Sequence, residues 1–123
     1  MNINIGVIIA ILSTHYLADF AFQSHWMASN KSKDNFVLSI HVAVYTVFLL
    51  FLGRGLFGAN HLLGLIWAAV NGLIHFATDY FTSRASAKRF AAKDYHNFFV
   101  VVGADQLLHY VVLLTTYVYF ASL

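Results

Sequence analysis

The sequence predicts an all-α polytopic membrane protein, a single domain over residues 1–123 built as an antiparallel bundle of four transmembrane helices. Hydrophobic residues make up 60% of the chain and charged residues only 10%, whereas soluble domains average roughly half and a quarter. Four apolar runs approach the ~20 residues that a helix needs to cross a bilayer. No cysteine is present, which excludes disulfides and thiolate chemistry.

The first run covers residues 3–22 and lacks both the basic start and the cleavage site of a secretory signal, so we expect a retained helix. His15, Asp19 and Gln23 recur in it at intervals of four residues. On an α-helix this spacing points the three side chains the same way. The polar residues 29–35 that follow predict a basic loop.

The second run, residues 36–52, carries His41 about one turn from its start. A glycine-rich break follows it and predicts a turn. The third run, residues 62–82, carries His75 and Asp79 near its far end, again four residues apart. The second and third runs therefore each bring an imidazole into the bundle, and the third adds a carboxylate on the same face.

The fourth run, residues 98–120, carries the pair in reverse order as Asp105 and His109. Before it, Lys and Arg recur at near-helical spacing over residues 84–93, which predicts a short basic helix lying on the lipid surface. The first and third connections hold most of the cations of the loops. By the positive-inside rule these two connections are cytoplasmic, and both termini lie on the non-cytoplasmic side.

This topology places seven titratable groups at one depth in the cytoplasmic half of the bilayer, namely His15, Asp19, His41, His75, Asp79, Asp105 and His109. Such groups are costly in a membrane unless they pair with one another or bind a metal. Imidazole and carboxylate donors without sulfur suit Zn²⁺, Mn²⁺ or Fe²⁺. We therefore expect the seven residues to hold one or two divalent ions per chain, zinc first, with manganese or iron as alternatives.

The same residues allow other interpretations. A hydrogen-bonded polar cluster could simply join the helices, and a chain of His and Asp could relay protons. Haem is disfavoured, because axial His ligands do not require an Asp one turn away on three helices.

Six further polar residues are predicted to support the metal ligands or bind substrate: Gln23, Asn30, Lys31, Asn71, Arg84 and Gln106. Lys31 and Arg84 could hold an anionic group, although a solvated, lipid-facing role is the simpler expectation. Asp19 and Asp105 are the predicted catalytic residues, because a carboxylate left off the metal can act as a general base.

Five motifs occur in order along nearly the whole chain: His15-x3-Asp19-Phe20-x2-Gln23, Trp26-Met27-x2-Asn30-Lys31, His41, His75-x3-Asp79 and Asp105-Gln106-x2-His109. With them the sequence resembles DUF3307, a family of small integral membrane proteins of bacteria and their phages. The resemblance implies a protein of the bacterial inner (plasma) membrane. It gives no information about activity, because the family has no known function. Membrane-bound metal-dependent hydrolases also carry His/Asp pairs on short membrane helices. This similarity is an analogy only.

These observations favour a metal-dependent hydrolase acting on a lipid or lipid-linked headgroup at the cytoplasmic leaflet. One alternative is a proton or divalent-cation transporter or channel subunit, which would need an oligomer. Another is a non-catalytic, phage-type membrane factor. The expected partners are the lipid bilayer and a lipid or phosphorylated headgroup, with a homo-oligomer left open. The net charge of +2 does not suggest nucleic-acid binding.

Overall fold

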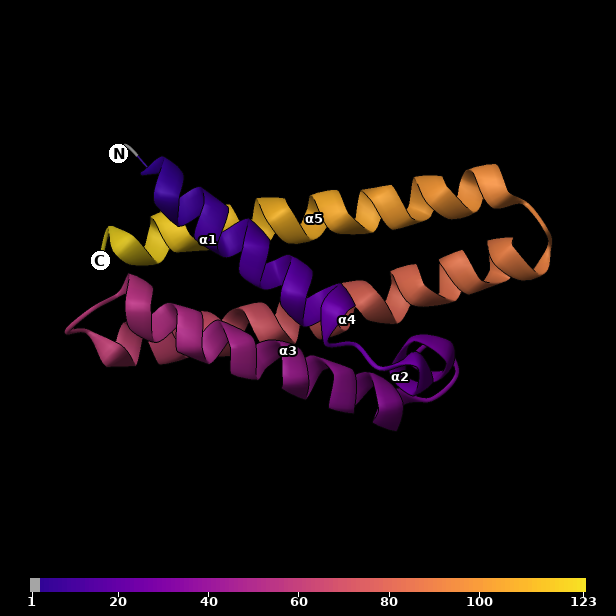
Figure 1. Ribbon diagram of the computed structural model, residues 1–123, viewed down its shortest axis with the longest axis horizontal. Helices are drawn as coiled ribbons and strands as arrows, with labels where there is room; N and C mark the ends of the chain where they lie inside the picture. The colour runs from indigo at the N-terminus through magenta and orange to yellow at the C-terminus, as the bar shows by residue number, and fades with distance from the viewer. Residues whose placement is uncertain (1–2) are drawn as a thin grey trace.

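The computed structural model describes residues 3–123, which form helices joined by short connections (Figure 1). The predicted all-helical class is confirmed. In chain order the elements are α1 (Ile5–Tyr16), the π-helical segment η1 (Leu17–Ala21), α2 (His25–Asn30), α3 (Asn35–Leu56), α4 (His61–Ala91) and α5 (Tyr95–Ala121).

Three helices, α3, α4 and α5, are long and apolar enough to cross a membrane. The first predicted span is shorter than expected. It consists of the 12 residues of α1 and the 5 of η1, which is less than the ~20 residues of a typical span. The structure is therefore compatible with membrane insertion through three long candidate spans and one shorter apolar stretch.

The long helices run antiparallel to their neighbours in sequence (Figure 1). α3 packs along α4 and α4 along α5, while α1 contacts α3 and α5 and crosses them at an angle. The start of α1, the end of α5 and the α3–α4 connection lie at one end of the molecule, which we call the terminal end. α2 and the α4–α5 connection lie toward the other, the α2 end.

Each α-helix begins after a residue whose side chain accepts a hydrogen bond from a backbone N–H of the first turn: Asn4, Ser24, Asp34, Asn60 and Asp94. These are preferred N-cap residues. The Asn97 side chain also donates to Asp94, which holds the pKa of Asp94 below its usual value. Two of the five Asp residues therefore start helices, and the other three lie within the apolar segments.

Residues 84–93 do not form the separate basic helix that the sequence predicted. α4 instead continues through residues 84–91, because residues 84–93 contain neither Gly nor Pro and have Ala at four positions. At 1.5 Å per residue, α4 is about 46 Å long, more than the ~30 Å hydrocarbon core. The α4–α5 hairpin therefore extends past the other helices at the α2 end (Figure 1). The predicted loop at residues 29–35 is likewise partly helical, since α2 reaches Asn30.

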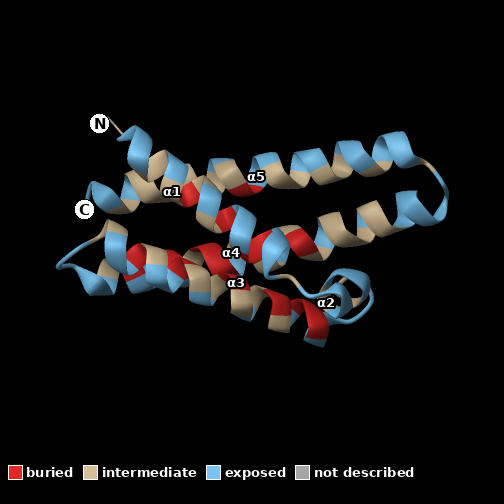
Figure 2. Cartoon of the chain, viewed as in Figure 1, coloured by how far each residue is buried: buried red, intermediate tan, exposed pale blue. Residues whose placement is uncertain are grey.

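Buried residues are concentrated where α1, α3, α4 and α5 meet (Figure 2). Nearer the terminal end this core is apolar and includes Ile11, Leu49, Trp67 and Leu113. There the backbones of α3 and α4 approach closely, since a Cβ atom added to Gly53 would lie 2.7 Å from the carbonyl oxygen of Gly64. Small residues permit such approaches between membrane helices. Nearer the α2 end the buried residues include Val37 and Leu38 but also a group of histidine and aspartate side chains.

Candidate metal centre

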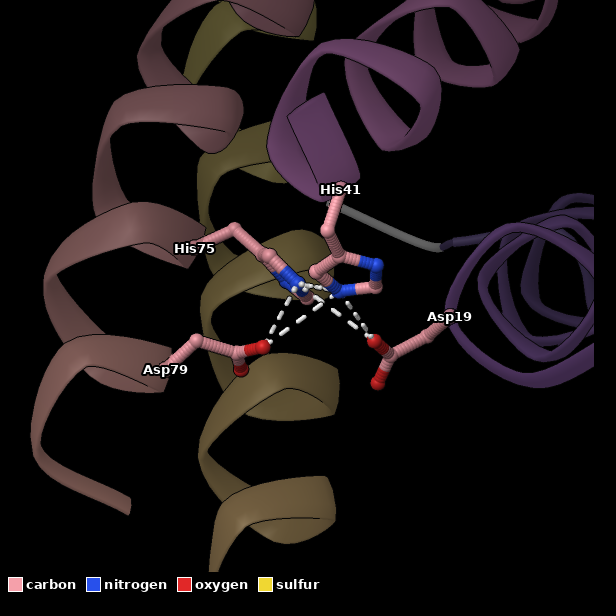
Figure 3. Close-up of side chains that lie close together, drawn as sticks. All are labelled: Asp19, His41, His75 and Asp79. Atoms are coloured by element: carbon pink, nitrogen blue, oxygen red, sulfur yellow. Dashed lines mark hydrogen bonds and ion pairs between the residues drawn. The ribbon is translucent and has the colours of Figure 1, made fainter. Parts of the chain in front are cut away.

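Four buried side chains from three elements point at one another (Figure 3). Asp19 comes from η1, His41 from α3, and His75 and Asp79 from α4. We call these four residues the quartet. η1 is a single wide turn in which the N–H of Phe22 donates to the carbonyl five residues back. π turns of this kind occur frequently at functional sites, and this one carries Asp19 into the quartet.

Five of the six distances between the ligand atoms of the quartet match the edges of a tetrahedron. His41 Nε2 lies 3.1 Å from Asp19 Oδ1, 3.3 Å from Asp79 Oδ2 and 3.2 Å from His75 Nε2. His75 Nε2 lies 3.4 and 3.5 Å from the same two oxygens. A tetrahedral ion with bonds of ~2.0–2.1 Å keeps its ligand atoms about 3.3–3.4 Å apart. The five distances therefore fit one small divalent ion.

Hydrogen bonds among the four side chains explain these short distances less well than a central metal ion does. A single N–H on the Nε2 atom of His41 can serve only one of its three close neighbours, whereas a central cation serves all four ligand atoms. The two carboxylates are 3% and 1% exposed, and buried charges need a compensating partner. Asp79 has the ammonium group of Lys31 at 2.8 Å, whereas Asp19 forms ion pairs only with histidines among the described residues. The quartet is thus a set of residues that could hold a metal ion.

A second group adjoins the quartet and shares Asp19 with it. It adds Asp105 and His109 from α5. His109 Nε2 lies 3.2 Å from Asp105 Oδ1 and 3.1 Å from Asp79 Oδ1. Asp79 therefore faces the quartet with one oxygen and His109 with the other. In the described part of the chain, six of the seven predicted ligands fall into these two groups.

His15 is the seventh, and it belongs to neither group. Its Nδ1 lies 3.0 Å from the hydroxyl of Tyr45, and its Nε2 lies 2.8 Å from Gln106 Oε1. Asp19 Oδ2 is farther from it, at 3.5 Å. The Tyr45 ring in turn stacks on His75, with 3.8 Å between ring centroids. His15 and Tyr45 therefore hold the site in place from the side of the apolar core.

Lys31 and Gln106, both predicted support residues, contact the Asp and His groups directly. Lys31 Nζ donates to Asp79 Oδ2 at 2.8 Å. Gln106 Nε2 donates to Asp19 Oδ2 at 3.1 Å and to Asp105 Oδ2 at 3.0 Å. One amide therefore fixes two carboxylates from different elements.

Asn30, Asn71 and Arg84 lie elsewhere and join helices or helix turns. Each donates to a backbone carbonyl four residues back in its own helix. Asn71 also bonds Thr116 on α5, and Arg84 bonds Asn35 at the start of α3. The hydrogen bonds of these three side chains therefore do not reach the Asp and His groups. The sequence shows that positions 30, 71 and 84 are polar, but it does not show which group each side chain bonds.

Thr82 is a site residue that the sequence reasoning missed. Its hydroxyl donates to Asp105 Oδ1 at 2.5 Å. Thr82 lies one turn beyond Asp79 on α4, and this spacing is the only signal in the sequence that could have identified it.

A cavity of about 600 Å³ adjoins the site at the α2 end, within the usual size range of ligand pockets. Asp19, Asp79 and Asp105 lie on its wall, as does Gln23, whose buried Oε1 has no hydrogen-bond partner in the described residues. The remaining lining comes chiefly from the α2 segment and the α4–α5 hairpin. The three carboxylates can therefore be reached by a molecule in this cavity.

Comparison with known proteins identifies the family. The chain matches the family described as "Protein of unknown function (DUF3307)" over residues 7–123, and it belongs to that family. No curated protein and no solved structure matches it. The predicted resemblance is confirmed, and the family description assigns no function.

Proposed function

We propose that this DUF3307 protein is a membrane-embedded, metal-dependent hydrolase that acts on a lipid or lipid-linked headgroup. The observation that carries the proposal is the quartet, whose ligand atoms are spaced for one divalent ion and which adjoins a ligand-sized cavity. A bound ion, Zn²⁺ first or else Mn²⁺ or Fe²⁺, would lower the pKa of a water ligand and polarise an ester oxygen.

Asp105 is the carboxylate best placed to act as general base. It lies outside the quartet, is on the cavity wall and is held at both oxygens by Thr82 and Gln106. Asp19, the other predicted catalytic residue, is proposed as a metal ligand. In the proposed step a water oxygen bonds to the phosphorus or carbonyl carbon and the ester bond breaks. The proton lost by the water passes through Asp105 to the leaving oxygen.

The proposed location is the cytoplasmic face of the bacterial inner membrane. We count the α1–η1 stretch as a fourth, short span beside α3, α4 and α5, which gives an antiparallel bundle of four. Lys31, Lys33 and the cations of the α4–α5 hairpin gather at the α2 end, which favours that end as cytoplasmic. Both termini would then lie on the opposite side.

A transporter of protons or divalent cations is a second candidate. It is favoured by the continuous series of polar contacts from Lys31 through Asp79 to His109. The apolar core next to the site, with Trp67 and Leu49 fully buried, argues against a path through one chain. This candidate therefore requires an oligomer.

Elemental analysis and a hydrolysis assay on the purified protein in lipid nanodiscs test the proposal. We expect one divalent ion per chain and metal-dependent cleavage of a lipid phosphate ester or acyl ester. His75→Ala should lose both, while His25→Ala, at an exposed histidine of α2, should keep both. Unchanged metal content in the chelator-washed His75→Ala protein would refute the proposal. Metal-dependent flux into sealed vesicles without hydrolysis would favour transport.

A further inference from the structure

We propose that the cavity beside the quartet binds an amphiphile with a phosphate-type head and a single apolar chain. The head would lie near Lys31 and Asp79, and the chain along the α4–α5 hairpin. This inference names the substrate class of the proposed hydrolase and rests on that function for the presence of the metal ion. Four properties of the cavity support it.

The first property is the position of Lys31. Its Nζ lies 2.8 Å from Asp79 Oδ2 and 3.5 Å from His41 Nε2, both of which are ligand atoms of the quartet. An ion in the quartet and the ammonium group would compete for the same carboxylate oxygen, and the two cations repel each other. A bound metal would therefore displace Lys31 from Asp79 toward the cavity, which this side chain already lines; the side chain is 16% exposed.

The second property is the charge of the cavity once the metal is present. Its wall includes three carboxylates, from Asp19, Asp79 and Asp105, and two ammonium groups, from Lys31 and Lys33. One divalent ion gives this set a net positive formal charge. In a site partly shielded from water the excess attracts an anion and repels a cationic headgroup.

The third property is a set of hydroxyl groups on the cavity wall, from Ser29 and Ser32 in the α2 segment and from Ser83 and Ser86 on α4. Ser29 bonds His25, and Ser86 donates to the carbonyl of Ser83. Ser83 Oγ is buried and has no hydrogen-bond partner among residues 3–123, and such groups usually have one. Hydroxyl and ammonium donors together suit the oxygens of a phosphate.

The fourth property is an apolar wall that continues from the polar floor. It consists of Ala87, Phe90 and Ala91 on α4 and of Phe98, Val101 and Val102 on α5. On each helix these residues recur at intervals of three and four, so one face of each helix is turned to the cavity. Along α4 the lining extends from Asp79 to Ala91, a rise of about 18 Å. A free phosphate would leave this wall uncovered, whereas an alkyl chain would cover it.

Octylphosphonate is a suitable probe, because its carbon–phosphorus bond is not an ester and binding is measured without turnover. We would titrate it into zinc-loaded protein in phosphatidylcholine nanodiscs and follow ³¹P NMR. We expect saturable binding that is at least 10-fold tighter than that of methylphosphonate, which has the head alone, and of octanol, which has the chain alone. Equal affinity of the two phosphonates would overturn the chain assignment, and equal affinity of octanol would overturn the head assignment.

Two pairs of variants locate the probe. Lys31→Gln should weaken octylphosphonate at least 10-fold, whereas Lys88→Gln, at an exposed cation of the same hairpin that does not line the cavity, should leave it unchanged. Val101→Trp should weaken octylphosphonate and spare methylphosphonate, whereas Val100→Trp, on the exposed side of α5, should change neither. Full octylphosphonate affinity in Lys31→Gln or in Val101→Trp would overturn the proposed site.

Two further measurements separate the possible failures. Thermal unfolding shows whether Val101→Trp folds. If it does not, the affinities of butylphosphonate and octylphosphonate for the unaltered protein test the proposed site of the alkyl chain. Equal affinities would overturn that site. Saturable phosphonate binding without cleavage of the matching phosphate ester would refute the hydrolase and leave the binding site intact. Ester cleavage without phosphonate binding would refute the binding site and leave the proposed hydrolase intact.

Discussion

The two halves of the bundle are built differently, although the same helices pass through both. Toward the terminal end α3 and α4 meet backbone to backbone at Gly53 and Gly64, and an apolar core fills the space between helices. Toward the α2 end the same helices hold charged side chains, and a cavity lies beside them. The first half is closely packed and apolar, and the second holds the candidate metal site, so substitutions in the two halves should have separable effects.

The largest expected effect is the loss of His41 from the polar half. His41→Ala removes a ligand atom that lies within 3.3 Å of three others. We expect zinc affinity to fall by more than 100-fold, because even changes in residues behind the ligands cost about 10–100-fold. The measurement is competition with a chromophoric chelator. Retained affinity with intact helical circular dichroism would show that the quartet is not a metal site.

Leu49→Ala makes the converse change in the apolar half. Leu49 is fully buried, and its truncation should lower the free energy of unfolding by about 2 kcal/mol. This is the low end for a core leucine, because transfer to lipid contributes little inside a membrane. Unfolding in a denaturing detergent measures it, and metal affinity should stay unchanged. A large loss of metal affinity would show that the two halves are coupled.

Gly53→Ala tests the close contact of α3 with α4. The added Cβ would meet the backbone of Gly64, which cannot move as a side chain does, so we expect a loss of about 1 kcal/mol in the free energy of unfolding. Gly55→Ala is the matched control, because its Cβ would meet nothing within 4 Å. If both variants unfold alike, the close approach is not a source of stability.

Thr82→Val makes the mildest change in the polar half, because it removes only the hydroxyl that donates to Asp105. We expect hydrolysis to slow about 10-fold with metal content unchanged, since this hydrogen bond positions the proposed base. Thr115→Val, an exposed site that bonds only carbonyls of its own helix, should leave the rate unaltered. A loss of metal in Thr82→Val would instead make Asp105 a ligand.

Much of this arrangement follows from the sequence. The spacing of His75 and Asp79, together with the position of His41 in the preceding run, predicted convergence of these side chains, because helical periodicity and antiparallel packing leave few alternatives. The two acids outside the cluster, Asp34 and Asp94, start helices as N-cap residues.

Other features depend on tertiary contacts that periodicity does not encode. Whether Arg84 faces an anion or Asn35 depends on how α3 packs on α4. The return of Lys31 to Asp79 depends on the turn after α2. The change from apolar to basic residues predicts the end of a span but not the end of a helix, and α4 continues to Ala91 because no residue there interrupts it.

The wide turn at Leu17–Ala21 has a consequence for how much change this chain tolerates. A π turn is an α-helix with one residue inserted, and deleting Ala18 would restore regular winding. Every residue before the deletion would then rotate by about 100° relative to those after it. Ile11 and Asp19 could not both keep their places. A single inserted residue therefore lets one short segment contribute both to the apolar core and to the candidate metal site.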